Sequence, residues 1–253
     1  MKMETVSISQ LNRRSVVNNS VRHGRNGAAP VSVFPNATKA NDSLFEHVAW
    51  LYAFCRERVF RDDTQRIITT LWPSGSAPAG SRVIELGCGP GFYSAQLAKH
   101  FPDIVVTGVD QSKNQLTWAR QRAAVQKLTN CSFARVNVLN LPFSDASFDA
   151  LVASRLFTVL PEQTRAVVEM YRVLKSGGRC FIAEPRYAIW ASIPLFAMWL
   201  LASMTHLGNG YREPRTATVF SRTAFAKIFA VCPWSRVDTW QDGRYHYALC
   251  KKA

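Results

Sequence analysis

Between Ser81 and Pro185, short apolar runs alternate with longer stretches that have the period of an amphipathic helix. The runs predict strands at residues 82–87, 104–110, 131–138, 148–156 and 179–185, and the stretches predict helices at 92–101, 114–127 and 161–174. Because successive strands separated by helices close as right-handed parallel crossovers, this order indicates an α/β fold. We expect a Rossmann-like, mainly parallel sheet with helices on both faces.

The C-terminal part of the chain adds a helix and a strand pair. Residues 221–232 have helical periodicity. Two alternating segments follow at 235–241 and 244–252, and Asp242-Gly243 between them is a dipeptide typical of hairpin turns. An antiparallel hairpin is therefore expected at the end of the chain.

The N-terminal part divides into two regions. Residues 1–40 lack helical periodicity and strand formers, and we expect a disordered basic arm there, with an organelle transit peptide as the alternative. Residues 41–79 contain two helical patterns, at 43–60 and 62–71, before a breaker-rich linker. They are predicted to form a helical cap on a single domain that covers 41–253.

A glycine-rich turn joins the first expected strand to the helix that follows. Gly87, Gly89 and Gly91 alternate over five residues. Glycine permits close approach of the backbone to a ligand, and the helix N-terminus behind the turn offers free N–H groups. The spacing GxGxG, with Pro90 inside it, differs from the GxGxxG of a dinucleotide-binding turn. The pattern therefore indicates a ligand site, but a pyrophosphate grip is not expected.

A carboxylate stands at the end of the second expected strand, nineteen residues after Gly91, at Asp110. A carboxylate at this point can accept from both hydroxyls of a ribose. The third expected strand ends in Asn137-Val138-Leu139. Open α/β sheets bind ligands at the carboxyl ends of their strands, so these three loops are expected to form one site.

Four segments between residues 80 and 185 resemble, in order and spacing, the signatures of class I S-adenosylmethionine-dependent methyltransferases. They are VIELGCGPGFYS, VTGVDQS, LPFSDASFD and YRVLKSGGR. The resemblance is strongest to the small-molecule branch that includes ubiquinone/menaquinone C-methyltransferases. It implies a seven-stranded sheet whose last strand is antiparallel and inserted beside the fifth, and it implies S-adenosyl-L-methionine as the cofactor.

The same resemblance assigns the methionine half of the cofactor to the first loop. The turn built from Gly87, Cys88, Gly89 and Gly91 is expected to pack against the methionine part. Glu85, two residues before the turn, is expected to hold the amino group.

The nucleoside half is assigned in the same way. Asp110 is expected to hold the ribose hydroxyls, and Gln111 and Val138 to flank the adenine. Asn137 departs from the family, which commonly has aspartate there, but an amide oxygen can still accept from the adenine amino group. Ser154, after the fourth strand, is expected to edge the methyl-transfer cleft.

The methyl acceptor is predicted to be a small molecule, because features of other acceptor classes are missing. The chain reads SRLF after the fourth strand, where enzymes that methylate base amino groups often carry an NPPY-like run. Its six cysteines include no CxxC pair, so structural zinc, a thioredoxin-type redox motif and a disulfide scaffold are not expected, and no metal site is predicted.

A stretch of 25 residues without a formal charge runs from Tyr187 to Tyr211. Its length suits a bilayer, but one crossing would separate the terminal hairpin from its sheet, and Pro194 interrupts any continuous helix. Residues 187–217 are therefore interpreted as an apolar lid over the acceptor or as helices in a membrane interface. A buried helix or an oligomer contact remains the alternative.

Methyl transfer from a sulfonium needs a general base only if the acceptor must lose a proton. Candidates by position are His206, Tyr52 and Glu184, with His47 and Tyr187 as weaker ones. His206 is the one group in the apolar stretch that titrates near neutrality.

The net charge of +14 points to anionic partners without choosing among them. Residues 1–41 carry six basic residues and one acid, and residues 187–253 carry eight basic residues and three acids. The chain is predicted to act on an apolar small molecule in the cytoplasm, with peripheral contact to an anionic membrane. The alternatives are an RNA methyltransferase that uses the basic arm, although nucleic acid is less favoured, and a non-catalytic scaffold that binds the cofactor.

Overall fold

The computed structural model describes residues 61–187 and 219–253. A seven-stranded sheet in the order β3-β2-β1-β4-β5-β7-β6 is its central layer. The strands are β1 (Arg82–Leu86), β2 (Val105–Asp110), β3 (Cys131–Arg135), β4 (Phe148–Ser154), β5 (Leu174–Pro185), β6 (Trp234–Asp242) and β7 (Tyr245–Lys252). The helices are α3 (Thr64–Leu71), α4 (Phe92–His100), α5 (Lys113–Val125), α6 (Gln163–Val173), α8 (Arg222–Lys227) and the 3-10 helix η1 (Ile228–Val231).

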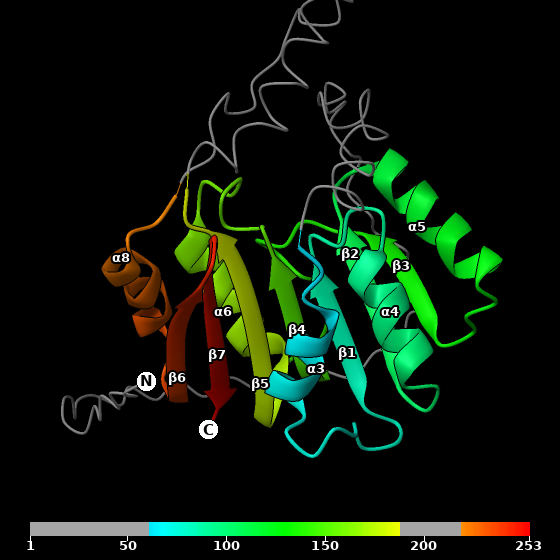
Figure 1. Ribbon diagram of the computed structural model, residues 1–253, viewed down its shortest axis with the longest axis horizontal. Coiled ribbons are helices and arrows are strands. Elements are labelled where there is room, and N and C mark those ends of the chain that lie inside the picture. The colour runs from blue at the N-terminus through cyan, green and yellow to red at the C-terminus, as the bar shows by residue number, and fades with distance from the viewer. Residues whose placement is uncertain (1–60, 188–218) are drawn as a thin grey trace, which may run out of the picture. The chain divides into compact units, whose positions relative to one another are not determined.

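Strand directions match the expected topology. β1 to β5 pair in parallel, whereas β7 lies between β5 and β6 and runs antiparallel to both. In Figure 1 the arrowheads of β4 and β5 point to the upper edge of the sheet and that of β7 points down. The predicted Rossmann-like, mainly parallel sheet with its last strand antiparallel beside the fifth is confirmed.

Helices cover both faces of the sheet. On one face, α3 and α4 bury Ile67, Leu71 and Leu97 against strand residues such as Val83 and Val152. On the other face, residues of α6, α8 and η1 pack against the alternate strand residues, which include Ile84, Leu86, Leu151 and Ile182. Because both faces are covered, the central strands are apolar at almost every position, which is why they read as continuous runs in the sequence.

Helix α3 is attached to the sheet by a buried polar contact. Tyr247 on β7 donates from its hydroxyl to Oδ1 of Asp63 over 3.0 Å, although the two residues are 184 positions apart. Both side chains are buried. On the other side of Asp63, its backbone N–H donates to the hydroxyl of Tyr93 in the first turn of α4 at 3.3 Å, so the start of α3 is fixed between β7 and α4. Among the helices of the described residues, none has the length and hydropathy to span a bilayer.

Several element boundaries differ from the predicted ones. β3 ends at Arg135 rather than 138, and α8 ends at Lys227 and continues as the 3-10 helix η1 instead of one helix to 232. β5 begins at Leu174, five residues earlier than expected. The predicted helix over 62–71 is present as α3, whereas the helix predicted over 43–60 lies outside the described residues.

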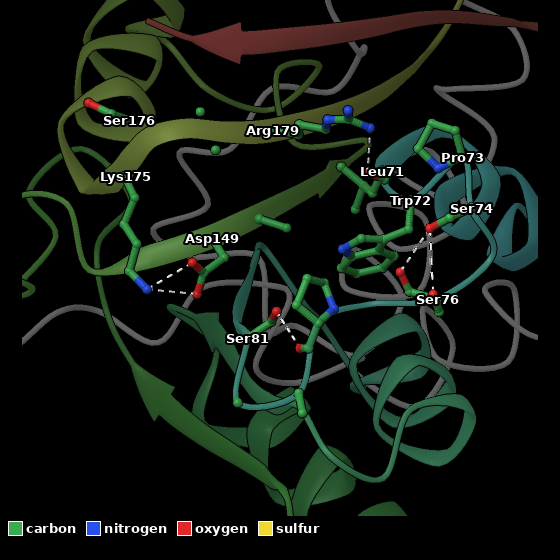
Figure 2. Close-up of a pocket in the computed structure, with 16 residues that line it drawn as sticks. Leu71, Trp72, Pro73, Ser74, Ser76, Ser81, Asp149, Lys175, Ser176 and Arg179 are labelled. Carbon is green, nitrogen blue, oxygen red and sulfur yellow. Dashed lines mark hydrogen bonds and ion pairs between the residues drawn. The ribbon is translucent and has the colours of Figure 1, made fainter.

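A groove of about 570 Å³ lies at the amino ends of β1 and β4 (Figure 2). Its walls are the linker after α3 and the segment around Lys175 at the start of β5. Lys175 pairs with Asp149 at 2.8 Å, and Arg179 donates to the Leu71 carbonyl at 2.9 Å. Its charged groups are thus engaged with the protein, and the groove is at the edge of the sheet opposite the expected ligand site.

Candidate active site

The candidate site is where the strand order reverses. β1 lies between β2 and β4, and the chain leaves β1 toward β2 before it returns to β4 on the other side. The loops that follow β1 and β4 therefore run in opposite directions, and a crevice is expected at the carboxyl ends of these two strands. The glycine-rich turn follows β1, whereas Asp110 and Ser154 are the last residues of β2 and β4.

The glycine-rich turn has a backbone that suits glycine alone. Gly87, Gly89 and Gly91 have φ angles of 65°, 52° and 70°. A Cβ atom on Gly91 would lie 2.8 Å from the Cβ of Ala119 and from the ring of Phe133. The turn is thus packed closely against α5 and β3, and it lies at the carboxyl end of β1.

Asp110 connects the turn to the second loop. Its Oδ2 accepts from the N–H of Gly89 at 2.8 Å, and its Oδ1 accepts from the N–H of Ser112 at 2.9 Å. These two bonds fix the orientation of the carboxylate, which is a group that accepts from hydroxyl donors. The side chain of Ser112 caps α5 by accepting from Gln115 N–H.

Glu85 lies beneath the turn. It is buried, and its Oε2 accepts from both the N–H and the hydroxyl of Ser94, at 2.7 and 2.5 Å. Ser94 was not expected to take part, and the signal that could have found it is its place in the first turn of the helix behind the glycines. The two bonds hold a negative charge at the helix N-terminus, which the helix dipole favours.

Two of the residues expected beside the adenine, Asn137 and Val138, are in the third loop, and Gln111 is in the second. Asn137 is exposed, and its Oδ1 accepts from the N–H of Leu139 at 2.9 Å. Val138 is buried in the core, whereas Gln111 is exposed. The backbone carbonyl of Gln111 accepts from Nε of Arg135 at 2.7 Å. These residues lie just beyond the carboxyl ends of β2 and β3, and their contact with a nucleoside stays a prediction.

Two arginines hold the loops from outside the site, and neither was singled out in the sequence. Arg122 on α5 donates from Nε to the carbonyl of Pro90 at 3.0 Å, and its guanidinium lies 5.8 Å from the ring centroid of Phe92. Arg135 holds the second loop through its bond to the Gln111 carbonyl. Both contacts are to backbone carbonyls, which no residue pattern reveals.

The loop after β4 is anchored from behind by Glu184. The N–H groups of Leu156, Phe157 and Thr158 donate to its carboxylate at 2.8, 2.9 and 3.2 Å. Glu184 is fully buried, and burial raises its pKa to about 7 against the opposing effect of these three donors. The geometry therefore gives Glu184 a positioning role, and a role as a general base stays a prediction.

The residues that this loop presents to the site are Ser154 and Arg155. Ser154 Oγ is buried with no hydrogen-bond partner among the described residues. Arg155 has a φ of 57°, and its guanidinium donates to the hydroxyl of Tyr245 at 2.8 Å. A left-handed conformation at a non-glycine residue costs about 1 kcal/mol or more, and such residues cluster at functional sites.

Cys88 contributes its backbone to the turn. Its N–H donates to the Val109 carbonyl at 3.0 Å, and its carbonyl accepts from Gly91 N–H at 2.9 Å. Burial, with the charges of Asp110 and Glu85, raises the pKa of its thiol well above the ordinary value. The thiol is therefore not a nucleophile here.

The remaining candidates for a general base are mostly beyond the described residues. His206, Tyr52 and His47 lie outside them, and their roles stay predictions. Tyr187 is 47% exposed just after β5, and the guanidinium of Arg186 lies 5.4 Å from its ring centroid.

A model of the methyltransferase domain matches residues 78–239, which is more than half of the chain. The chain belongs to the methyltransferase family. The recognition of a class I S-adenosylmethionine-dependent methyltransferase is confirmed, and the matched range contains the glycine-rich turn, Asp110 and the loop after β4.

Similar proteins include small-molecule methyltransferases. The chain is 34% identical over 123 residues to 2-methyl-6-phytyl-1,4-hydroquinone methyltransferase 1 of Oryza sativa subsp. japonica, covering 48% of this chain and 36% of that protein. It is 34% identical over 103 residues to the demethylmenaquinone methyltransferase of Deinococcus radiodurans, covering 41% and 42%. The matched region of this methyltransferase chain thus covers less than half of the full length of either relative.

Among solved structures, geranyl diphosphate C-methyltransferase of Streptomyces coelicolor A3(2), in complex with S-adenosyl-L-homocysteine, has a similar fold. The TM-score is 0.56 at 15% identity, with 76% of this chain and 75% of that chain covered. At this identity the likeness supports the fold alone.

Proposed function

We propose that the protein transfers a methyl group from S-adenosyl-L-methionine to a small lipophilic acceptor at an O, N or C atom. The observation that carries the proposal is the Asp110 carboxylate, which the N–H groups of Gly89 and Ser112 hold at the carboxyl end of β2. It places an acceptor for hydroxyls next to a turn that has no room for side chains.

The residues fit this cofactor in three respects. The glycine-rich turn is a cradle that a Cβ at Gly91 would disrupt, Asp110 suits a ribose diol, and Glu85 is an anion suited to an ammonium group. Asn137 and Gln111 would border the adenine, with Val138 behind them in the core. We propose these contacts for the bound state.

The bound cofactor supplies a methyl group that is already activated on a sulfonium. The work left to the protein is to align the acceptor with that methyl group and to exclude water. We propose that Ser154 and Arg155 border the acceptor, held in place through the three backbone bonds of Glu184. For an acceptor that must lose a proton, His206 and Tyr52 are the proposed bases.

A lipophilic acceptor is favoured by two observations. The names of the relatives in Oryza sativa and Deinococcus radiodurans specify a phytyl-hydroquinone and demethylmenaquinone, both apolar ring compounds. The sequence has an uncharged run from Tyr187 to Tyr211, which we propose as part of a cover over the acceptor within 187–217. We propose that the protein works at a membrane surface.

The test is methyl transfer from labelled S-adenosyl-L-methionine to demethylmenaquinone and to phytyl-hydroquinone, followed by mass spectrometry of the lipid extract. We expect a mass gain of one methyl group with the wild-type chain and none with Asp110→Ala. Cofactor binding without transfer to any extract would support the scaffold alternative. Transfer to RNA that requires residues 1–40 would support the RNA alternative.

A further inference from the structure

Three arginines from separate parts of the chain meet at the end of β5. Arg186 follows β5, Arg244 is in the turn between β6 and β7, and Arg222 begins α8. In Figure 1 the end of β5 and the turn between β6 and β7 lie at the upper edge of the sheet, and α8, which packs against β7, stands at the left. The backbone N–H of Arg186 donates to the carbonyl of Arg244 at 2.8 Å, and its guanidinium donates to the Gly243 carbonyl at 3.0 Å. We call Arg186, Arg222 and Arg244 the arginine face.

Two of the three guanidiniums lie apart from the carboxylates of the described residues. In residues 61–187 and 219–253, neither Arg186 nor Arg222 forms an ion pair with a carboxylate. Asp242, the acid at the same hairpin, is engaged with Arg61 and Arg66 on the other side of the turn. Positive charge therefore accumulates where Arg222 and Arg244 are exposed to solvent.

The buried side chain of His246 lies between the β6–β7 hairpin and the loop that leads into α8. Its imidazole is buried, with Nε2 at 2.9 Å from the Phe220 carbonyl and Nδ1 at 3.1 Å from Nε2 of Gln241. Burial lowers its pKa, and the positive charges of Arg186 and Arg222 lower it further. Through its two bonds this ring joins the loop before α8 to the hairpin that carries Arg244.

An exposed aromatic side chain borders the arginine face. Tyr187 is 47% exposed, and the guanidinium of Arg186 lies 5.4 Å from its ring centroid. Aromatic side chains with one apolar and one polar end are typical of the boundary between lipid and water. In the sequence, the uncharged run that ends at Tyr211 begins at this same residue.

The arginine face is separate from the proposed methyl-transfer site. β4 separates β5 from β1, so the end of β5 is two strand spacings, or roughly 10 Å, from the glycine-rich turn. An anion bound at the face would not replace the cofactor. It would orient the carboxyl edge of the sheet toward the surface that carries the anion.

We propose that the arginine face binds the phosphate groups of anionic lipids and docks the carboxyl edge of the sheet onto a membrane. The inference rests on the proposed function in one respect, because a lipophilic acceptor would then enter the site directly from the bilayer. Charge complementarity favours lipid phosphates, and the exposed Tyr187 with the uncharged run after it favours a lipid surface over RNA.

The test is co-sedimentation of the full chain with vesicles of phosphatidylcholine alone and of phosphatidylcholine mixed with phosphatidylglycerol. We expect wild-type binding to the mixed vesicles that weakens with salt. Replacing Arg186, Arg222 and Arg244 together with Gln should weaken it by about a hundredfold, because each cation near an anionic surface contributes about one kcal/mol.

A matched variant removes three exposed cations from the opposite edge, namely Lys99, Lys127 and Lys251. It should bind mixed vesicles like the wild-type chain. Equal losses in both variants, or equal binding of the wild-type chain to both vesicle types, would overturn the proposal, as would a loss in RNA binding without a loss in vesicle binding. Binding of S-adenosylhomocysteine, titrated into each variant, tests the proposed function separately from membrane binding. If the triple variant does not fold, the single variant Arg222→Glu, at an exposed position, repeats the vesicle test.

Discussion

At the residue scale, Gly91 combines two constraints that most glycines meet singly. Its φ of 70° is in the left-handed region, and a Cβ there would lie 2.8 Å from Ala119 and Phe133. Gly177 has a φ of 76°, but a Cβ on it would meet no other atom within 4 Å, so it has only the first constraint. Comparing Gly91 with Gly177 thus separates the effect of backbone strain from that of crowding at the glycine-rich turn.

Gly91→Ala should lower the free energy of unfolding by about 2–4 kcal/mol and abolish binding of S-adenosylhomocysteine, because strain and crowding add. Gly177→Ala should cost about 1 kcal/mol and leave binding unchanged. Urea unfolding and calorimetric titration of both variants check this. Equal stability losses in the two variants would contradict the role given to crowding.

Glu184 is the second residue whose environment makes a sharp prediction. Glu184→Ala would leave three buried N–H groups of the loop after β4 without an acceptor, at about 1–3 kcal/mol for each. We expect the variant to unfold at a much lower temperature than the wild-type chain. Glu162→Ala, at an exposed side chain paired with Arg165, is the control and should change the melting temperature little.

The raised pKa of Glu184 also sets a pH dependence. Burial raises this pKa from 4.5 to about 7, so the folded chain binds more protons than the unfolded chain between these values. The contribution of Glu184 to stability is therefore present at low pH and is lost as the pH rises from 4.5 toward 7, with a slope of at most about 1.4 kcal/mol per pH unit. Urea unfolding across this range should show the slope in the wild-type chain and not in Glu184→Gln. A slope that survives the substitution would assign it to another group.

At the element scale, α5 does more than cover β2 and β3. Its Arg122 reaches the Pro90 carbonyl inside the glycine-rich turn, so the helix fixes the turn from outside the site. A guanidinium bond to a carbonyl contributes roughly 1.5–3 kcal/mol.

Arg122→Met should therefore weaken binding of S-adenosylhomocysteine by about tenfold or more and lower the melting temperature by several degrees. Arg165→Met, on the exposed face of α6, removes the same charge far from the turn and should leave binding unchanged. Calorimetric titration of the two variants compares them. Unchanged affinity in Arg122→Met would mean that the turn keeps its shape without this bond.

The elements also show which parts of the fold local sequence predicts. The glycine-rich turn and Asp110 were predicted because the turn directly follows β1 and Asp110 ends β2, so a short window of sequence contains each signal. The end of β3 was misplaced because Asn137 forms a local bond to Leu139 that breaks the strand pattern. The start of β5 was missed because Leu174 pairs with Phe148, a long-range contact across a glycine-rich segment.

At the scale of the whole molecule, the contacts that sequence could not predict are those between distant segments. Glu184 on β5 lies opposite His246 in the register of the antiparallel pair β5–β7. Asp63 accepts a hydrogen bond from the hydroxyl of Tyr247, 184 residues away. The first contact fixes the position of Glu184, which holds the loop after β4, and the second attaches the start of α3 to the sheet. No periodicity in either segment indicates its partner, because the partner is chosen by the sheet order rather than by local propensity.

The net charge of +14 is likewise an overall property whose meaning depends on position. In the described residues, Arg122 and Arg135 hold loops of the site through backbone carbonyls, whereas Arg186 and Arg222 have no carboxylate partner. Some of the charge therefore stabilises the fold, and another part is available to an anionic surface. This division is what the proposed docking of the arginine face requires.

The central claim is that this carboxyl edge binds S-adenosylmethionine through Asp110. Calorimetric titration of S-adenosylhomocysteine into the wild-type chain, Asp110→Ala and Asp103→Ala tests it most directly. Asp103 is an exposed loop carboxylate on the same chain and serves as the matched control. We expect binding by the wild-type chain and by Asp103→Ala, and affinity at least about a hundredfold weaker in Asp110→Ala, because two charge-assisted bonds are lost. No binding by the wild-type chain, or equal affinity in Asp110→Ala, would contradict the claim.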